Sequence, residues 1–276
     1  MANLIKCASL NIERLYLFSL LIVLLIFVSC NSQTIKFVTV KSQKITAPPA
    51  ISLNDSIFNS LNKKWIFSFY FDRSMKYENS LFEVTSLSSL LNKYNLNEEV
   101  NAILLLCADD YQGIISFDDI KRYDLQLALR IKLSKEQAQP DWLQPLLIIV
   151  PNNVKPPLLE RFLTANIKEL RFVSLPNYYA PIESLKLTSD VSKAGLKTFK
   201  DNCIFCHSIN NVGGNKGGSL VDKYALTLDR EKQRFTRAFF KKHGIDNEEK
   251  QNTKQFLTNN SLDAVLKFLQ DIKVDL

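Results

Sequence analysis

The sequence has few cysteines, and they do not form the even-numbered series of a disulfide framework. The five are Cys7, Cys30, Cys107, Cys203 and Cys206, of which only the last two stand close together. This pattern argues against a small secreted scaffold held together by disulfides. It points instead to specific chemistry at individual cysteines.

Long apolar runs are also scarce. The one long run, Leu15–Val28, is interrupted only by Ser19 and follows Lys6 and Arg14. A transmembrane helix needs about 20 apolar residues, so this run is short for a span, and the content of 46% hydrophobic residues argues against a polytopic membrane protein. A charged start and a short apolar middle are typical of a secretory signal peptide. An uncleaved N-terminal anchor is the alternative.

The apolar run ends in Phe27-Val28-Ser29-Cys30. This resembles a bacterial lipoprotein signal, in which a cysteine after a small residue becomes the lipidated first residue, although Phe27 stands where leucine is usual. We expect a lipoprotein-type signal peptide over residues 1–29, with lipid on Cys30, and a polar tether over residues 30–60. An ordinary signal with an incidental cysteine is the alternative. Either reading exports the mature protein to the periplasmic side of a bacterial membrane.

No recognition motif for nucleic acid is present, although the net charge is +7. A moderate positive excess could favour an anionic membrane surface or an acidic protein partner through long-range attraction. We therefore expect a membrane contact through the lipid or the N-terminal anchor, and no nucleic-acid partner.

The rest of the chain predicts an α+β protein of two domains. Residues 61–185 are expected to form a mixed α/β domain, with apolar strands at 65–71, 102–106 and 146–150 and a helix at 87–94. Residues 186–276 are expected to be all-α. Their helices start after Ser189, cover Asp229–Lys242, and end with an amphipathic segment through Leu262, Val265, Leu266, Leu269 and Ile272.

The sequence Cys203-Ile204-Phe205-Cys206-His207 is a C-x-x-C-H motif. In such a motif two thiols add across the vinyl groups of haem and the adjacent histidine binds the iron. A structural zinc site would need a second pair of ligands, yet no cysteine and only His243 follow. A thioredoxin-like redox pair would follow a strand, whereas this motif follows a helical pattern. The motif therefore predicts one covalent haem c.

Residues 190–273 resemble the class I mono-haem cytochrome c family. Gly195 and Phe199 match the small and aromatic residues of the family's first helix, and Phe268-Leu269 matches the aromatic-leucine pair of its last helix. The resemblance implies that these two helices cross closely and that His207 is the proximal iron ligand. It also implies an all-α cytochrome c domain after the mixed α/β domain.

Two positions depart from that family. The family's Gly-Pro-x-Leu segment, whose proline carbonyl steadies the proximal histidine, reads Gly217-Gly218-Ser219-Leu220, so His207 is expected to be less rigidly oriented. The family's distal ligand is a methionine, but no methionine follows Met75. His243 and Gln255 are the candidate distal ligands, Lys254 is a third, and a vacant or water-filled position is the remaining alternative.

Residues 65–180 resemble, weakly, a reduced sulfite-oxidase-type molybdopterin-binding domain. Cys107 ends a strand at a place comparable to that family's molybdenum ligand. The arginines and histidines that would hold the pterin phosphate are not identifiable, so a buried structural cysteine is favoured over a molybdopterin site. Asp109 and Asp110 are expected to be turn residues.

These features predict an exported, membrane-tethered mono-haem cytochrome that exchanges electrons with redox partner proteins and turns over no substrate. Two alternatives remain open. One is an oxidoreductase subunit whose first domain binds a molybdenum cofactor and passes electrons to the haem. The other is a gas-binding haem sensor, suggested by the missing methionine.

Overall fold

The computed structural model describes residues 34–37, 51–52, 59–134, 139–187, 189–243 and 257–274. The chain divides into two units, residues 1–33 and 34–276, and the described residues all belong to the second. The predicted signal peptide, Cys30, most of the predicted tether, Lys254 and Gln255 lie outside the described residues. Among the residues that are described, no helix combines the length and apolar character needed to cross a bilayer.

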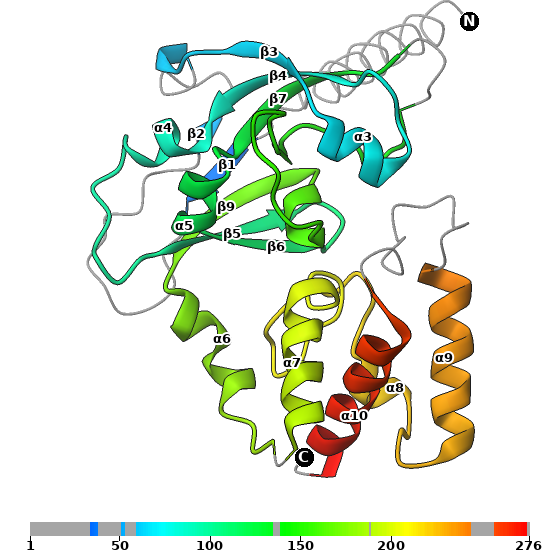
Figure 1. Ribbon diagram of the computed structural model, residues 1–276. Coiled ribbons are helices and arrows are strands. Elements are labelled where there is room, and N and C mark those ends of the chain that lie inside the picture. Colours follow the sequence, from blue (N-terminus) through cyan, green and yellow to red (C-terminus); the bar gives the residue numbers. More distant parts are fainter. Residues whose placement is uncertain are drawn as a thin grey trace, which may run out of the picture. The chain divides into compact units, whose positions relative to one another are not determined.

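The first sheet has five strands in the order β2-β1-β9-β5-β6 (Figure 1). Its strands are β1 Thr34–Phe37, β2 Ile51–Ser52, β5 Ala102–Cys107, β6 Gln112–Ser116 and β9 Ile167–Val173. Strand β1 runs parallel to β9, and the other neighbouring pairs are antiparallel. The predicted strand at 102–106 is confirmed as β5, whose residues are nearly all buried.

The second sheet has four antiparallel strands in the order β3-β4-β7-β8. They are β3 Lys64–Phe67, β4 Leu81–Ser86, β7 Gln126–Lys132 and β8 Leu147–Ile149. The predicted strand at 146–150 is confirmed as β8. The predicted strand at 65–71 is wrong in its second half, because β3 ends at Phe67 and a helix begins at Phe69.

Serines fix several of the points at which a helix begins. The hydroxyl oxygens of Ser68, Ser86, Ser116, Ser189 and Ser219 each accept a hydrogen bond from a backbone N–H three residues later. Such N-caps satisfy a donor that the first turn of a helix would otherwise leave unpaired. They precede α3 Phe69–Met75, α4 Leu87–Leu91, α5 Phe117–Arg122, α7 Asp190–Asn202 and α8 Leu220–Lys223.

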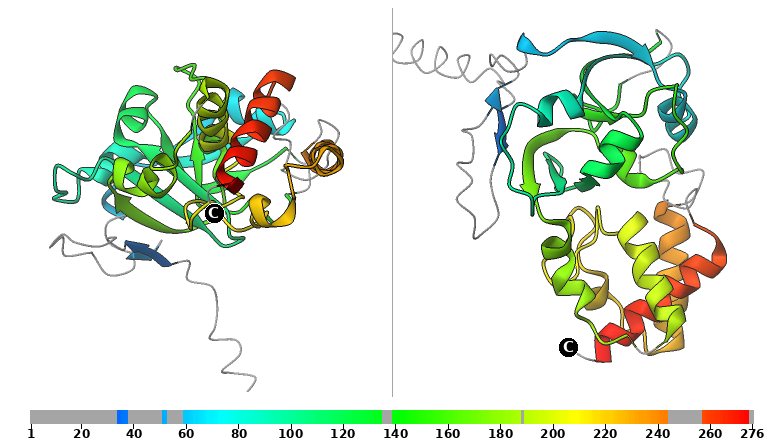
Figure 2. Two further views of the ribbon diagram at one scale, coloured as in Figure 1. Left: turned by 90° about the horizontal axis from the view of Figure 1, so that it is seen from below. Right: turned by 60° about the vertical axis from the view of Figure 1, so that its left-hand side comes forward.

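The remaining helical elements of the described residues are η1 Glu160–Leu163, α6 Leu175–Glu183, α9 Asp229–His243 and α10 Asn259–Val274. Helices α7 and α10 cross in close contact (Figures 1 and 2). A Cβ atom added to Gly195 would lie 2.0 Å from the carbonyl oxygen of Ala264, so only glycine permits this approach. The rings of Phe199 and Phe268 pack beside this point at 5.7 Å. The predicted contact between these two helices is therefore present.

The predicted fold class, a mixed α/β domain followed by an all-α cytochrome c domain, is wrong. The sheets are antiparallel apart from the β1–β9 pair, and one hydrophobic core joins β5, β6 and β9 to α7, α9 and α10. Backbone hydrogen bonds also cross the expected division, from Gln112 N to Phe205 O at 2.9 Å and from Asn215 N to Asp110 O at 3.0 Å. The helices are thus packed into a mixed structure and do not form an independent all-α domain.

Candidate cofactor-binding site

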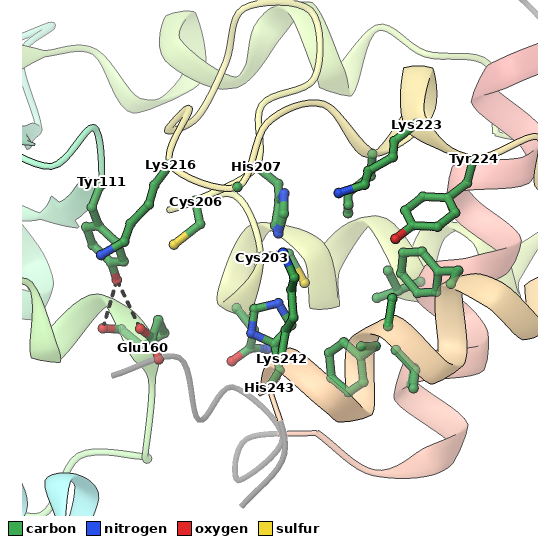
Figure 3. A pocket seen from close by; sticks show the side chains of 18 residues that line it. Tyr111, Glu160, Cys203, Cys206, His207, Lys216, Lys223, Tyr224, Lys242 and His243 are labelled. Carbon is green, nitrogen blue, oxygen red and sulfur yellow. Dashed lines mark hydrogen bonds between the residues drawn. The ribbon is translucent and has the colours of Figure 1, made fainter. Parts of the chain in front are cut away.

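A cavity opens where the C-terminal end of α7 faces α9 (Figure 3). Its volume is about 180 Å³, and it opens to solvent. Cys203, Cys206, His207 and His243 all line it. The structure therefore brings both motif cysteines and the only two histidines of the chain to one place.

The C-x-x-C-H motif forms a turn directly after α7. The backbone N–H of Cys203 donates to Phe199 O at 2.9 Å, and the N–H of His207 donates to Cys203 O at 3.0 Å. The two intervening residues, Ile204 and Phe205, are each 1% exposed and belong to the hydrophobic core. Because these two side chains anchor the turn in the core, the sulfur atoms and the imidazole are left to face the cavity.

His207 is held in position by the glycine-rich loop, residues 210–218. Its Nδ1 lies 2.8 Å from the carbonyl oxygen of Gly218, and a protonated Nδ1 donating there leaves the Nε2 lone pair free for a metal. A Cβ atom added to Gly217 would lie 2.1 Å from the His207 ring, so the loop fits tightly against it. The expectation of a less rigidly oriented His207 is wrong, because the Gly218 carbonyl orients the ring.

The pKa of His207 is lowered from its ordinary value. Burial is the largest cause, and the nearby His243, Lys223 and Lys242 act in the same direction, whereas the hydrogen bond to Gly218 opposes them. Burial disfavours the charged imidazolium. The ring is therefore kept in the neutral form, which is the form that binds a metal.

His243, at the C-terminal end of α9, faces His207 across the cavity (Figure 3). Their ring centroids are 6.2 Å apart and their planes are nearly perpendicular, at 84°. A metal held about 2 Å from one nitrogen of each imidazole would require ring centres roughly 6 Å apart. Phe239, one turn earlier in α9, packs against the His243 ring at 5.3 Å. The two imidazoles are therefore close enough that both would be able to hold one metal ion.

The chemistry of Cys203 argues against a catalytic thiol. Its pKa is raised to about 12, chiefly because the thiol is buried, and also because Cys206 and Glu160 are nearby. Reactive thiols of disulfide oxidoreductases have lowered pKa values instead. Within the described part of the chain, no three His, Cys, Asp or Glu side chains are grouped closely enough to bind a metal ion together. The pair therefore fits covalent attachment better than thiol redox chemistry or a structural zinc site.

Three polar residues of the cavity were not found from the sequence. The Tyr111 hydroxyl lies 3.4 Å from the Glu160 carboxylate, and both side chains are buried. The Oδ1 of Asn202 is also buried and has no hydrogen-bond partner within the described structure. A buried oxygen that lines a cavity and has no hydrogen-bond partner is suited to accept a hydrogen bond from a bound molecule. Tyr111 follows β5 and Glu160 begins η1, both far from the motif in the sequence, so no local signal connects them with it.

Lysines give the cavity a positive rim. Lys216, Lys223 and Lys242 line it, and Lys216 forms an ion pair with Asp109 at 2.6 Å. Asp109 was expected to be only a turn residue, but it also links the β5–β6 turn to the glycine-rich loop. Asp110 does adopt a turn conformation, with a φ of 62°. Cationic side chains at the rim are suited to a group that carries carboxylates.

Cys107 lies elsewhere. It ends β5, is 1% exposed, and belongs to the hydrophobic core rather than to the lining of the cavity. Its backbone N–H donates to Tyr111 O at 3.0 Å, which closes the β5–β6 turn. The candidate distal ligands Gln255 and Lys254 lie outside the described residues.

The chain matches no model of a known protein family, and no curated protein matches it significantly. The functional interpretation therefore depends on the motif and on the side chains that surround the cavity.

Proposed function

We propose that this protein is an exported electron carrier that holds one haem covalently through Cys203 and Cys206. One observation carries the proposal: both cysteines, His207 and His243 line a single cavity, with the two imidazole centroids 6.2 Å apart. A C-x-x-C-H motif alone could be a chance match. The presence of a second histidine beside the motif, 36 residues later in the sequence, supports a haem whose iron His207 and His243 would both hold.

The proposal gives a role to six residues of the cavity. Cys203 and Cys206 would form the thioether bonds, and His207 would bind the iron through Nε2, because its Nδ1 faces Gly218. His243 would bind from the opposite side. The haem would supply reversible one-electron chemistry when bound. Phe239 and Leu220 line the same cavity and would limit the access of water.

An electron carrier fits the two-histidine arrangement better than a gas sensor. A sensor needs an iron that leaves a position open for the gas, whereas here His243 would hold the iron together with His207. The molybdenum alternative has less support, because Cys107 is buried in the core and does not line the cavity that Lys216, Lys223 and Lys242 surround. The partners that we propose are redox proteins, and the lysines around the cavity favour acidic ones.

The first test is chemical detection of the haem. The full chain, exported from a bacterium that has a haem-attachment system, should keep its colour after denaturing electrophoresis and should stain for haem. Its alkaline pyridine spectrum should be that of a c-type haem with one iron per chain. Complete loss of colour on denaturation would contradict covalent attachment. Elemental analysis of the same sample for molybdenum would test the alternative.

We also propose that lipid on Cys30 tethers the protein to the periplasmic side of a membrane. Cys30→Ala is expected to block lipid addition, so that the variant either remains unprocessed or is released by osmotic shock, while the wild type stays in the membrane fraction. Mass spectrometry of the mature N-terminus is the direct measurement. A mature chain that begins at another residue and carries no lipid mass would show that the tether is of another kind.

A further inference from the structure

Three large aromatic side chains are exposed in one row at the edge of the second sheet. Trp65, Phe67 and Phe69 occupy alternate positions along β3 and into the first turn of α3. These residues are 43%, 48% and 70% exposed. Trp65 and Phe67 are alternate residues of an extended strand and therefore point to the same side, and Phe69 follows them at the start of α3. The surface of these three residues is called the aromatic face below.

This face is not an incompletely covered part of the core. The opposite side of the same sheet is well buried, through Phe82, Val84 and Ala128. Ile66, which lies between Trp65 and Phe67, packs against that cluster. Strand β3 is also an edge strand, paired only with β4 among the described strands (Figure 1). Exposed rings in a row, rather than scattered singly, indicate a surface that meets something.

Cations surround the aromatic face. The strand register places Glu83 beside Trp65 and Arg130 beside Glu83, and it places Lys132 in line with Phe67 through Leu81. Lys63 and Lys64 precede the first ring, and both are exposed. The Arg130 guanidinium lies 5.4 Å from the centre of the Trp65 ring.

The face is positively charged despite the presence of Glu83. That carboxylate is bound by Arg130 through two contacts of 2.5 and 2.6 Å. Lys63 and Lys132 then remain as two positive charges beside the rings, whereas Lys64 is paired with the buried Val84 and points to the other side of the strand. Protein–protein interfaces are depleted in lysine at their centres. Tryptophan and phenylalanine beside lysine and arginine are instead typical of surfaces that lie on an anionic bilayer.

We propose that the aromatic face binds the surface of a membrane rich in anionic phospholipid. Trp65, Phe67 and Phe69 would enter the headgroup region, and Lys63 and Lys132 would pair with lipid phosphates. The inference is independent of the haem proposal, because none of these residues lines the cavity. The two proposals can therefore fail separately.

The two tryptophans of the chain allow a direct test. Trp142→Phe leaves Trp65 as the only indole, and Trp65→Phe leaves Trp142, which packs against the buried cluster on the other side of the sheet. Each full-length variant is mixed with vesicles of phosphatidylglycerol and phosphatidylcholine that carry a nitroxide near the headgroup. Emission is compared with that in identical vesicles without nitroxide, so that quenching inside the protein cancels.

Trp65 is expected to be quenched in the anionic vesicles and Trp142 to be unaffected. Changing Lys63 and Lys132 to Gln should raise the lipid concentration for half-maximal quenching about fivefold per charge removed. Phe69→Ser should also weaken quenching, whereas Leu228→Ser, which changes an exposed leucine of another segment, should not.

Two results would overturn the proposal. One is equal quenching of Trp65 and Trp142, which would mean that no particular face meets the lipid. The other is an unquenched Trp65 in a protein that sediments as a dimer only while Phe67 and Phe69 are intact, which would assign the face to a second copy of the chain.

Discussion

Replacing both motif cysteines, Cys203→Ala with Cys206→Ala, is expected to abolish the retention of haem by the denatured chain. Each single replacement should leave one thioether at most and reduce haem staining strongly. The physical reason is that, among the described residues, Cys203 and Cys206 are the cysteines that line the cavity, and the buried Ile204 and Phe205 fix the turn that presents them. The measurement is haem staining normalised to the amount of exported protein.

Cys107→Ala is the matched control for the cysteine variants. Cys107 is also a buried cysteine, but it lies in β5 and not at the cavity. Its replacement should lower the free energy of unfolding by about 1 kcal/mol through lost packing and leave haem staining unchanged. Full staining of the double variant Cys203→Ala/Cys206→Ala would contradict the proposed attachment. Loss of staining in Cys107→Ala, in a chain shown to be folded, would point to a second role for that residue.

The local features of the chain could be predicted from the sequence because their causes are local. Periodic apolar residues and a serine N-cap define α7, and Gly195 could be predicted as the crossing point because only glycine allows such an approach. The strands at 102–106 and 146–150 could be predicted from short, continuous apolar runs.

The fold class could not be predicted, because it depends on contacts between distant segments. Phe205 was interpreted as an intervening residue of the motif, but its ring stacks on Tyr111 at 5.8 Å and its carbonyl accepts a hydrogen bond from Gln112. Nothing in the residues around Phe205 indicates that a β-turn almost a hundred positions earlier will meet it. The motif is thus built against the first sheet, and Phe205 and Tyr111 belong to one hydrophobic core.

The polar lining of the cavity was missed for a related reason. Glu160 is a charged residue in a short helical turn, where a sequence pattern predicts a solvated side chain, yet it is 6% exposed. It is buried because η1 packs beside β6 and α7, and Arg161 next to it pairs with Asp201 of α7 at 2.5 Å. Only the tertiary structure brings Glu160 to Tyr111 and to the cavity. The same holds for His243, which the sequence offered only as one of several candidates.

The prediction with the widest consequence concerns whether His243 would bind the iron together with His207. If His207 and His243 both bind the iron, the reduced wild-type protein should bind carbon monoxide slowly or not at all. His243→Ala should bind the gas rapidly, because it removes the ring whose centre stands 6.2 Å from that of His207. A two-histidine haem should also have a lower reduction potential than a histidine-methionine haem, and the weak red absorption band of a thioether ligand should be absent.

Two variants serve as controls for this experiment. Lys242→Ala changes the neighbouring residue of α9, which also lines the cavity, and should leave carbon monoxide binding unchanged. Gln255→Ala tests the competing ligand and should likewise have no effect. The two imidazoles could also meet as an ordinary edge-to-face ring pair, since such pairs have the same spacing. In that case the wild type would bind carbon monoxide as fast as His243→Ala, and a gas-binding role would replace electron transfer as the better account of the cavity.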